Sequence, residues 1–130
     1  MPAVIQCVKP VESAQKFIMK RYALFAFRGD PICFIHVMLN ALDLKSKGHA
    51  VKVIMEGDAV RLVEILQKEE NKLFARLQEE DLVDCICRAC SAKLGVLEYN
   101  QGCGIRLSDE MNGHPAMSTY LDQGYEIITF

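Results

Sequence analysis

The sequence predicts an α/β fold: one compact domain with a mostly parallel central sheet of about five strands and helices on both faces. Apolar runs of strand length alternate along the chain with segments whose apolar residues recur at helical spacing. Most of these runs are nearly continuous, which is typical of strands covered on both faces. A length of 130 residues is usual for one domain, so residues 1–130 are expected to form a single unit.

The first strand is expected at Tyr22–Phe27, which is almost entirely apolar. In the turn that follows, Asp30 is the expected N-cap of a helix and Pro31 its first residue. Apolar residues at three- and four-residue spacing carry this helix to about Lys47, and Gly48 ends it.

A second strand is expected at Ala50–Met55, followed by a turn over 56–58 in which Asp58 caps a helix. The charged segment 68–80 has apolar residues at helical spacing and should form another amphipathic helix. The remaining elements are expected in this order: a strand at 82–87, a helix at 89–100, a surface loop at 105–113 around the end of a short strand, a helix that begins at His114-Pro115 and stops at Gly124, and a strand at 125–130.

Residues 1–20 allow two interpretations. Pro2 and Pro10 interrupt the apolar pair at 4–5, whereas Ser13 could cap a short helix through Met19 or Lys20. The segment is therefore either an extra strand and helix or an arm that packs on a neighbouring subunit.

The composition excludes several classes of partner. With a net charge of −2 and no basic run that alternates with aromatic residues, nucleic-acid binding is not expected. No segment reaches the roughly 18–20 continuous apolar residues of a membrane helix, and the start of the chain lacks the pattern of a signal peptide. We therefore expect a cytoplasmic protein, in which six cysteines more often serve as free, catalytic or metal-binding thiols than as a disulfide scaffold.

Three cysteines, Cys85, Cys87 and Cys90, lie close together where the third strand meets the following helix. Backbone N–H groups at such a junction are unpaired and lie at the positive end of the helix dipole. That environment favours the thiolate, which is the nucleophile, and Arg88 adds positive charge nearby. Cys90 is therefore the first candidate for a reactive thiol.

Other interpretations of these cysteines stay open. Cys87 and Cys90 form a C-x-x-C pair, which can act as a redox dithiol with Cys87 as the resolving thiol. Cys85 is expected to share a strand face with Cys87 and to serve as inert core packing. A metal site of the three cysteines with His114 would lack the second ligand pair that structural zinc usually uses, so no metal is predicted.

Two turns are expected to lie at the same edge of the sheet as the cysteines. The turns at 28–30 and 56–58 both follow strands, and ligands bind at the carboxyl edge of open α/β sheets. Neither turn is a G-x-G-x-x-G or Walker loop, so no cofactor is predicted. The candidate binding residues are Arg28, Asp30, Glu56, Gly57, Arg88, Ser91 and His114.

Four stretches carry a resemblance to a known family. They are Arg28-Gly29-Asp30-Pro31 after an apolar strand, Val53-Ile54-Met55-Glu56-Gly57, Ala89-Cys90-Ser91-Ala92-Lys93-Leu94-Gly95, and Gly124-Tyr125-Glu126-Ile127-Ile128. In their order and spacing, over roughly residues 21–130, the chain resembles the DsrE/DsrF-like sulfur-relay family, including its small YchN-like homo-oligomeric members.

The resemblance implies a central parallel sheet and assembly into trimers or hexamers. It also implies that Cys90 is the sulfur acceptor, since sulfur-carrying members hold a persulfide on a cysteine at the matching strand-to-helix junction. Cys85 and Cys87 lie outside the usual pattern of the family.

The sequence thus predicts a homo-oligomeric, sulfurtransferase-type persulfide carrier that receives sulfur from a donor protein and passes it to an acceptor thiol. Two alternatives remain: a thiol-disulfide redox protein that uses Cys87 and Cys90, and a non-catalytic oligomeric interaction protein.

Overall fold

The computed structural model describes residues 17–130, which form strands, α-helices and one 3-10 helix. In chain order the elements are β1 (Arg21–Ala26), α2 (Pro31–Ser46), β2 (Ala50–Met55), the 3-10 helix η2 (Gly57–Arg61), α3 (Leu62–Lys68), α4 (Lys72–Glu79), β3 (Val83–Cys87), α5 (Arg88–Lys93), α6 (Leu97–Gln101), β4 (Leu107–Ser108), α7 (Met117–Asp122) and β5 (Glu126–Thr129).

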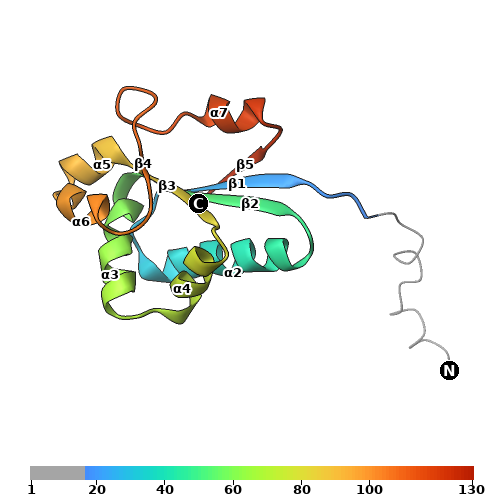
Figure 1. Ribbon diagram of the computed structural model, residues 1–130, viewed down its shortest axis with the longest axis horizontal. Helices are drawn as coiled ribbons and strands as arrows, with labels where there is room; N and C mark the ends of the chain where they lie inside the picture. Colours follow the sequence, from blue (N-terminus) through green and yellow to red (C-terminus); the bar gives the residue numbers. More distant parts are fainter. Residues whose placement is uncertain (1–16) are drawn as a thin grey trace.

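Within the described residues, five strands form one sheet in the order β4-β3-β2-β1-β5, and every pairing in it is parallel. Figure 1 shows α2, α3 and α4 on one side of this sheet and α7 on the other, while α5 and α6 lie at one end. The α/β class and the parallel sheet of five strands with helices on both faces are therefore confirmed.

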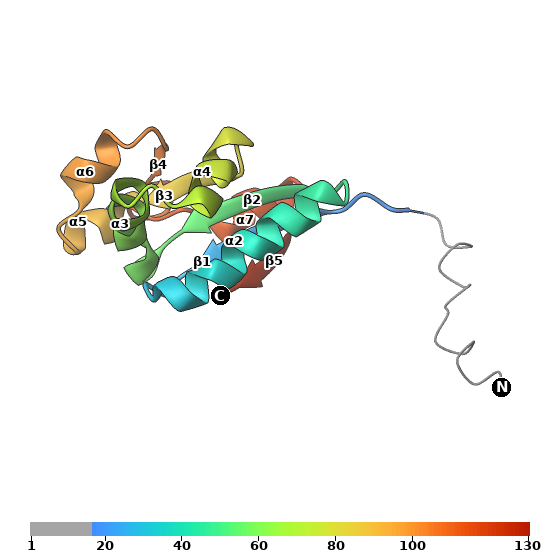
Figure 2. The same cartoon turned by 90° about the horizontal axis from the view of Figure 1, so that it is seen from below.

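The two faces of the sheet are covered unequally. On one face, α2 lies across β1 and β2 (Figure 2) and joins α3 and α4 in the larger core cluster, which includes Leu24, Val53 and Ile86 of the strands. On the other face, Tyr120 of α7 packs in a smaller cluster with side chains such as Phe25. The second face therefore has the thinner cover, although its strand residues in this cluster are still buried.

Local signals set the bounds of α2 as expected. The side chain of Asp30 accepts a hydrogen bond from the backbone N–H of Ile32 at 2.9 Å, which satisfies one of the free donors of the first turn. Pro31 is the first helical residue, and its missing N–H would have no partner there in any case. Gly48 follows the helix with a φ of 93°, a left-handed conformation that suits glycine.

Two helices differ from the sequence expectation. The single helix expected at 89–100 is divided into α5 and α6, because Gly95 takes a φ of 78° and ends α5 in the left-handed conformation. Asp58 does not cap the helix after β2: η2 comes first, and the carboxylate pairs with Arg61 at 2.6 Å instead.

The segment before α7 differs as well. His114 and Pro115 do not begin that helix, which starts at Met117 with Ala116 in the cap position. The expected loop around a short strand is present, with β4 at its centre, and His114 lies at the far end of that loop, where it pairs with Met111 through an isolated antiparallel bridge.

No helix in the range 17–130 is long and apolar enough to cross a membrane. The two interpretations of residues 1–20, including the cap at Ser13, fall mainly on residues 1–16, which lie outside the described part of the chain. Residues 17–20 belong to neither a helix nor a strand.

Candidate functional site

The carboxyl ends of β1, β2 and β3 meet at one edge of the sheet. Ala26 of β1 pairs with Met55 of β2, which in turn pairs with Ile86 of β3, so the segments after these strands begin side by side. The convergence expected from parallel strand order is confirmed. It brings the turn that contains Glu56 next to the first residues of α5, where Cys90 lies.

Cys87 is the last residue of β3 and also the N-cap of α5. Its buried Sγ accepts a hydrogen bond from the backbone N–H of Cys90 at 3.4 Å. The Ser91 hydroxyl donates to the carbonyl of Cys87 at 2.7 Å and accepts from the buried side-chain amide of Asn100 at 3.0 Å. These bonds hold the first turn of α5 and therefore the positions of both sulfur atoms.

The sulfur of Cys90 has a backbone donor of its own. The N–H of Gly57 donates to Cys90 Sγ at 3.3 Å. Gly57 adopts a φ of 53°, and a Cβ at this position would lie 3.0 Å from the carbonyl oxygen of Phe27, so glycine suits the close approach. Cys90 is only half-buried, which means that its sulfur combines a hydrogen-bond donor with access from solvent.

His114 reaches the sulfurs from the loop before α7. Its Nδ1 lies 3.1 Å from Cys87 Sγ and 3.7 Å from Cys90 Sγ. The loop is seated on α5, where the N–H of Ala89 donates to the carbonyl of Gly113 at 2.8 Å. Gly113 has a φ of 91°, and a Cβ there would lie only 2.9 Å from that of Ala89, so a larger residue would push His114 away.

Burial governs the protonation of the inner side chains. Loss of solvent raises the pKa of the Cys87 thiol to about 12, so this sulfur keeps its proton at neutral pH. Burial also raises the pKa of Glu56, while the adjacent His114 and the Cys87 thiol act in the opposite direction. The oxygen Oε1 of Glu56 lies 3.7 Å from His114 Nδ1, so a proton on the imidazole would pair with this carboxylate.

Glu56, Cys87, Cys90 and His114 form what we call the cysteine cluster. One oxygen, nitrogen or sulfur atom of each lies within 4.8 Å of those of the others. Of the residues predicted for the site, the structure brings these four together with Gly57, whose N–H contacts Cys90.

The other predicted site residues have different places. Arg28 is exposed in the turn after β1, and Asp30 caps α2. Arg88 is the exposed first residue of α5, and Ser91 is buried and acts on the backbone of Cys87. Within residues 17–130, the side chains of these four residues do not belong to the cysteine cluster.

Two positioning residues, Gly113 and Asn100, were not predicted from the sequence. Gly113 precedes His114 directly, and a glycine next to a polar loop residue is only a weak signal of close approach. Asn100 also donates to the carbonyl of Val60 at 3.1 Å. Its position depends on the break at Gly95, which the prediction of one continuous helix excluded.

Cys85 lies only two residues before Cys87 but in different surroundings. Its Sγ is 3.4 Å from the hydroxyl oxygen of Tyr120, and burial raises the pKa of the thiol to about 11. The two side chains belong to different buried clusters, since Cys87 ends β3 and caps α5 whereas Cys85 packs with Tyr120.

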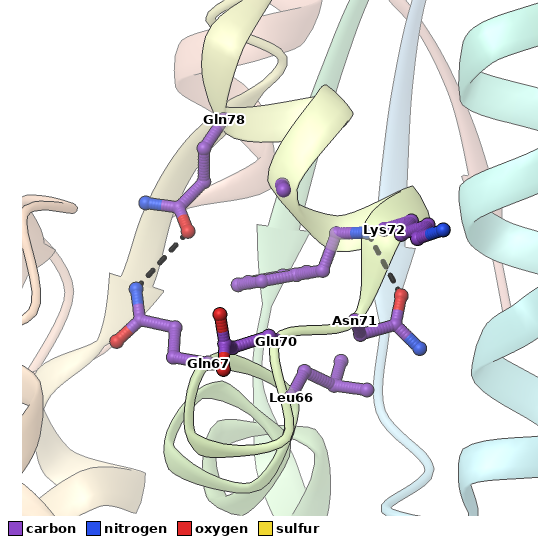
Figure 3. Close-up of a pocket in the computed structure, with 8 residues that line it drawn as sticks. Leu66, Gln67, Glu70, Asn71, Lys72 and Gln78 are labelled. Carbon is purple, nitrogen blue, oxygen red and sulfur yellow. Dashed lines mark hydrogen bonds between the residues drawn. The ribbon is translucent and has the colours of Figure 1, made fainter.

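Two cavities differ in their relation to the cysteine cluster. A cavity of about 650 Å³ lies between α3 and α4 (Figure 3), where Gln67 donates to the side chain of Gln78 at 3.0 Å, and none of the four cluster residues lines it. A second cavity, of about 570 Å³, borders the cluster directly. Its lining includes Phe27, Glu56, Met111, His114, Pro115 and Met117. The second cavity gives an apolar approach to the reactive edge.

Comparison with known proteins now identifies the class of protein. The model of the DsrE/DsrF-like family matches residues 14–130. The chain therefore belongs to the DsrE/DsrF-like family, as its sequence suggested.

Two archaeal proteins are similar to this chain. The uncharacterized protein MJ0733 of Methanocaldococcus jannaschii is 36% identical over 96 residues, which cover 72% of this chain and 77% of that protein. An uncharacterized protein of Archaeoglobus fulgidus is 38% identical over 40 residues, which cover 31% of this chain and 66% of that protein. No solved structure matches the chain significantly.

Proposed function

We propose that the protein is a cytoplasmic sulfur carrier, which holds sulfane sulfur as a persulfide on Cys90 and passes it to a partner thiol. The observation that carries this proposal is the hydrogen bond of 3.3 Å from the N–H of Gly57 to the half-buried sulfur of Cys90. A backbone N–H directed at sulfur stabilises negative charge there, and the thiolate is the nucleophilic form of cysteine. Membership of the DsrE/DsrF-like family supports the same chemistry.

The loading step transfers one sulfur atom and needs no added oxidant. The thiolate of Cys90 attacks the outer sulfur of a donor persulfide, R–S–SH. The S–S bond of the donor breaks as the new S–S bond forms, the donor leaves as R–S⁻, and the proton stays on the outer sulfur. Unloading repeats the exchange, with an acceptor thiolate attacking the outer sulfur and Cys90 leaving as the thiolate.

His114 is the group that can move a proton in this exchange. Its Nδ1 lies 3.7 Å from Cys90 Sγ, so the neutral imidazole can take the thiol proton before attack and return it to the leaving thiolate. The nearby carboxylate of Glu56 would stabilise the imidazolium that forms. The buried thiol of Cys87 stays protonated and adds no second negative charge beside the nucleophile.

The surroundings of the cluster support contact with other protein chains. The apolar cavity beside His114 offers a surface on which a donor or acceptor protein can dock. Leu121 of α7 is 57% exposed and Ile128 of the edge strand β5 is 39% exposed, which agrees with further burial in a trimer or hexamer. We therefore propose a homo-oligomer that exchanges sulfur with donor and acceptor proteins.

Intact-mass measurement tests the proposal. Reduced protein is incubated with a small-molecule persulfide, beside Cys90→Ser and beside Cys103→Ser, which removes a half-buried cysteine outside the cluster. Wild type and Cys103→Ser should gain one sulfur atom that reductant removes, whereas Cys90→Ser should gain none. Equal sulfur gain by Cys90→Ser would contradict the proposal.

The same measurement separates the carrier from a redox dithiol. The sulfurs of Cys87 and Cys90 lie within 4.8 Å of each other, a distance from which a small rearrangement could form a disulfide. A dithiol would lose two hydrogen atoms on mild oxidation without gaining sulfur, and Cys87→Ser would abolish that loss. A carrier should still gain sulfur in Cys87→Ser, because the acceptor is Cys90.

A further inference from the structure

The cysteine cluster contains the ligand types that a thiophilic metal ion prefers. Cys87 and Cys90 supply two sulfurs, His114 supplies an imidazole nitrogen, and Glu56 supplies a carboxylate oxygen. Zn²⁺ in proteins is bound by these groups, usually four of them in a tetrahedron. Mg²⁺ and Ca²⁺ prefer sites made of oxygen ligands, so the donor set favours a softer ion.

The distances between the donor atoms agree with one shared ion. In a tetrahedral zinc site with ordinary bond lengths, neighbouring ligand atoms lie about 3.4–3.8 Å apart. Nδ1 of His114 is 3.7 Å from Cys90 Sγ, 3.7 Å from the oxygen of Glu56 and 3.1 Å from Cys87 Sγ. Since all four donor atoms lie within 4.8 Å of one another, small side-chain rotations complete the tetrahedron.

The scaffold holds three of the four groups in place through contacts of their own. The sulfurs are positioned by the first turn of α5, which Ser91 and Asn100 secure. The imidazole is positioned by the close packing of Gly113 on Ala89. Three separate segments therefore deliver ligands to one point, and a preformed site reduces the ordering that binding must impose.

The burial of the cluster supports the same conclusion. Glu56 and Cys87 are both buried, so the charge of an ion between them would be little screened by water and would act strongly on both side chains. The thiols would release their protons to solvent as the ion binds.

We propose that Glu56, Cys87, Cys90 and His114 form a four-coordinate binding site for Zn²⁺. The sequence shows only one local ligand pair because the other two ligands come from the turn after β2 and the loop before α7. All four positions are filled by protein atoms, which is typical of structural or regulatory zinc rather than catalytic zinc.

One consequence rests on the proposed function. Cys90 Sγ cannot bind zinc and carry persulfide sulfur at the same time, so zinc would hold the protein in an unloaded form. Zinc binding itself requires no sulfur transfer, and it is measured on protein that has never met a sulfur donor.

Metal titration tests the site. Chelator-treated, reduced full-length protein is titrated with Zn²⁺ and with Co²⁺, whose thiolate charge-transfer and d–d absorption report tetrahedral sulfur ligation. We expect one ion per chain in wild type, no competition from Mg²⁺ or Ca²⁺, and an affinity loss of at least about 10- to 100-fold in Cys87→Ser, Cys90→Ser, Glu56→Gln and His114→Gln. Cys103→Ser and His36→Gln, which change residues outside the cluster, should bind as wild type does.

Two titration results would overturn the site: wild-type binding no tighter than that of the Cys87→Ser, Cys90→Ser double variant, or undiminished binding by both Glu56→Gln and His114→Gln.

A measurement on wild type alone guards against misfolded variants. Zn²⁺ should slow the alkylation of Cys90, mapped by mass, without slowing that of half-buried Cys33 or Cys103. Equal rates at Cys90 with and without zinc would also contradict the proposal. Sulfur loading of metal-free wild type is measured separately, so either proposal can fail alone.

Discussion

Strand β3 carries cysteines in two contrasting environments. Cys85, inside the strand, is enclosed by core side chains, and its Sγ contacts only the hydroxyl of Tyr120 among the hydrogen-bonding groups of residues 17–130. Cys87 ends the strand, and with Cys90 it meets side chains from two other segments. A shift of two residues along one strand therefore moves a thiol from the core, beside Tyr120, to the sheet edge where Glu56, Cys90 and His114 meet.

The polar groups beside the two cysteines differ in the same way. Around Cys85, the Tyr120 hydroxyl donates to Asp84, which also pairs with Arg106 at 2.8 Å, so the local hydrogen-bonding groups satisfy one another. In the cysteine cluster, by contrast, the donor atoms face one point and their contacts to His114 are 3.1–3.7 Å long. Saturated groups stabilise a fold, whereas groups that converge on one point are free to bind or react.

The largest expected difference is in thiol reactivity. At pH 8, we expect iodoacetamide to alkylate Cys90 at least about 1000-fold faster than Cys85 in the native protein. Cys85 reacts only when the core opens, which in a typical domain costs several kcal/mol, and its pKa of about 11 leaves little thiolate. Mass mapping of peptides after timed alkylation measures both rates.

Denaturant provides the control for this comparison. In unfolding concentrations of urea, both thiols should react at rates that differ by only a few-fold, since burial no longer separates them. Alkylation of Cys85 at the rate of Cys90 in the native protein would show that the two environments are not distinct.

The second expected difference is in stability. Tyr120→Phe removes the hydroxyl that serves Cys85 and Asp84, and we expect it to lower the free energy of unfolding by about 1.5–3 kcal/mol, as for a hydrogen bond to a charged group. Tyr99→Phe is the matched control, because its hydroxyl donates to the neutral side chain of Gln67 at 2.8 Å. It should cost only about 0.5–1.5 kcal/mol. Urea unfolding measures the free energy of unfolding of both variants. Equal losses would show that the hydrogen bond to Asp84 stabilises the fold no more than an ordinary one.

The order of elements, most strand bounds and one half of the site were predictable. β2 was expected at its observed bounds because its apolar run lies between Gly48 and a polar turn. The meeting of Glu56 with Cys87 and Cys90 followed from parallel strand order alone. In these cases the deciding signals lie within a few residues or follow from topology.

The contacts that place the rest of the site depend on long-range packing. His114 was a candidate by its residue type, but the packing of Gly113 on Ala89 that brings it to the sulfurs joins segments 24 residues apart and has no local sequence pattern. Gly95 could have continued a helix at a modest energetic cost. The buried bonds of Asn100 to Val60 and Ser91 accompany the turn observed there. Tertiary contacts of this kind overrule local helix propensity.

A third prediction concerns the pH dependence of stability. Burial raises the pKa of Glu56, so the folded protein holds a proton there that the unfolded chain releases near pH 4.5. The stability that this proton contributes is therefore fully present below the pKa of Glu56 in the unfolded chain. It is lost as the pH rises through the pKa of Glu56 in the folded protein. Glu56→Gln lacks this titration. Hence its stability relative to metal-free wild type should increase between about pH 4 and pH 8. Urea unfolding of chelator-treated samples at several pH values measures the free energy of unfolding of both proteins. If the two free energies changed with pH in parallel, the prediction would be contradicted.

The smallest expected effect lies on the Cys85 side of β3. The ammonium group of Lys52 lies over the rings of Tyr125 and Tyr120, at 5.1 and 5.8 Å from their centroids, and 3.9 Å from Asp84. Lys52→Met keeps most of the aliphatic stem and removes the charge, so we expect a loss of about 0.5–1 kcal/mol. The loss should shrink little in high salt, because part of it is a cation–π contact with partly covered rings rather than a solvated ion pair.

Lys93→Met on α5 is the matched control, since Lys93 is exposed and should tolerate the change within about 0.5 kcal/mol. Neither variant should alter the alkylation rate of Cys90, which depends on Gly57 and His114 at the other end of the strand. A changed rate in Lys52→Met would mean that the two environments of β3 are coupled through the strand. Stability loss without a change in reactivity would show that the core end of β3 supports the fold and leaves the chemistry to its carboxyl end.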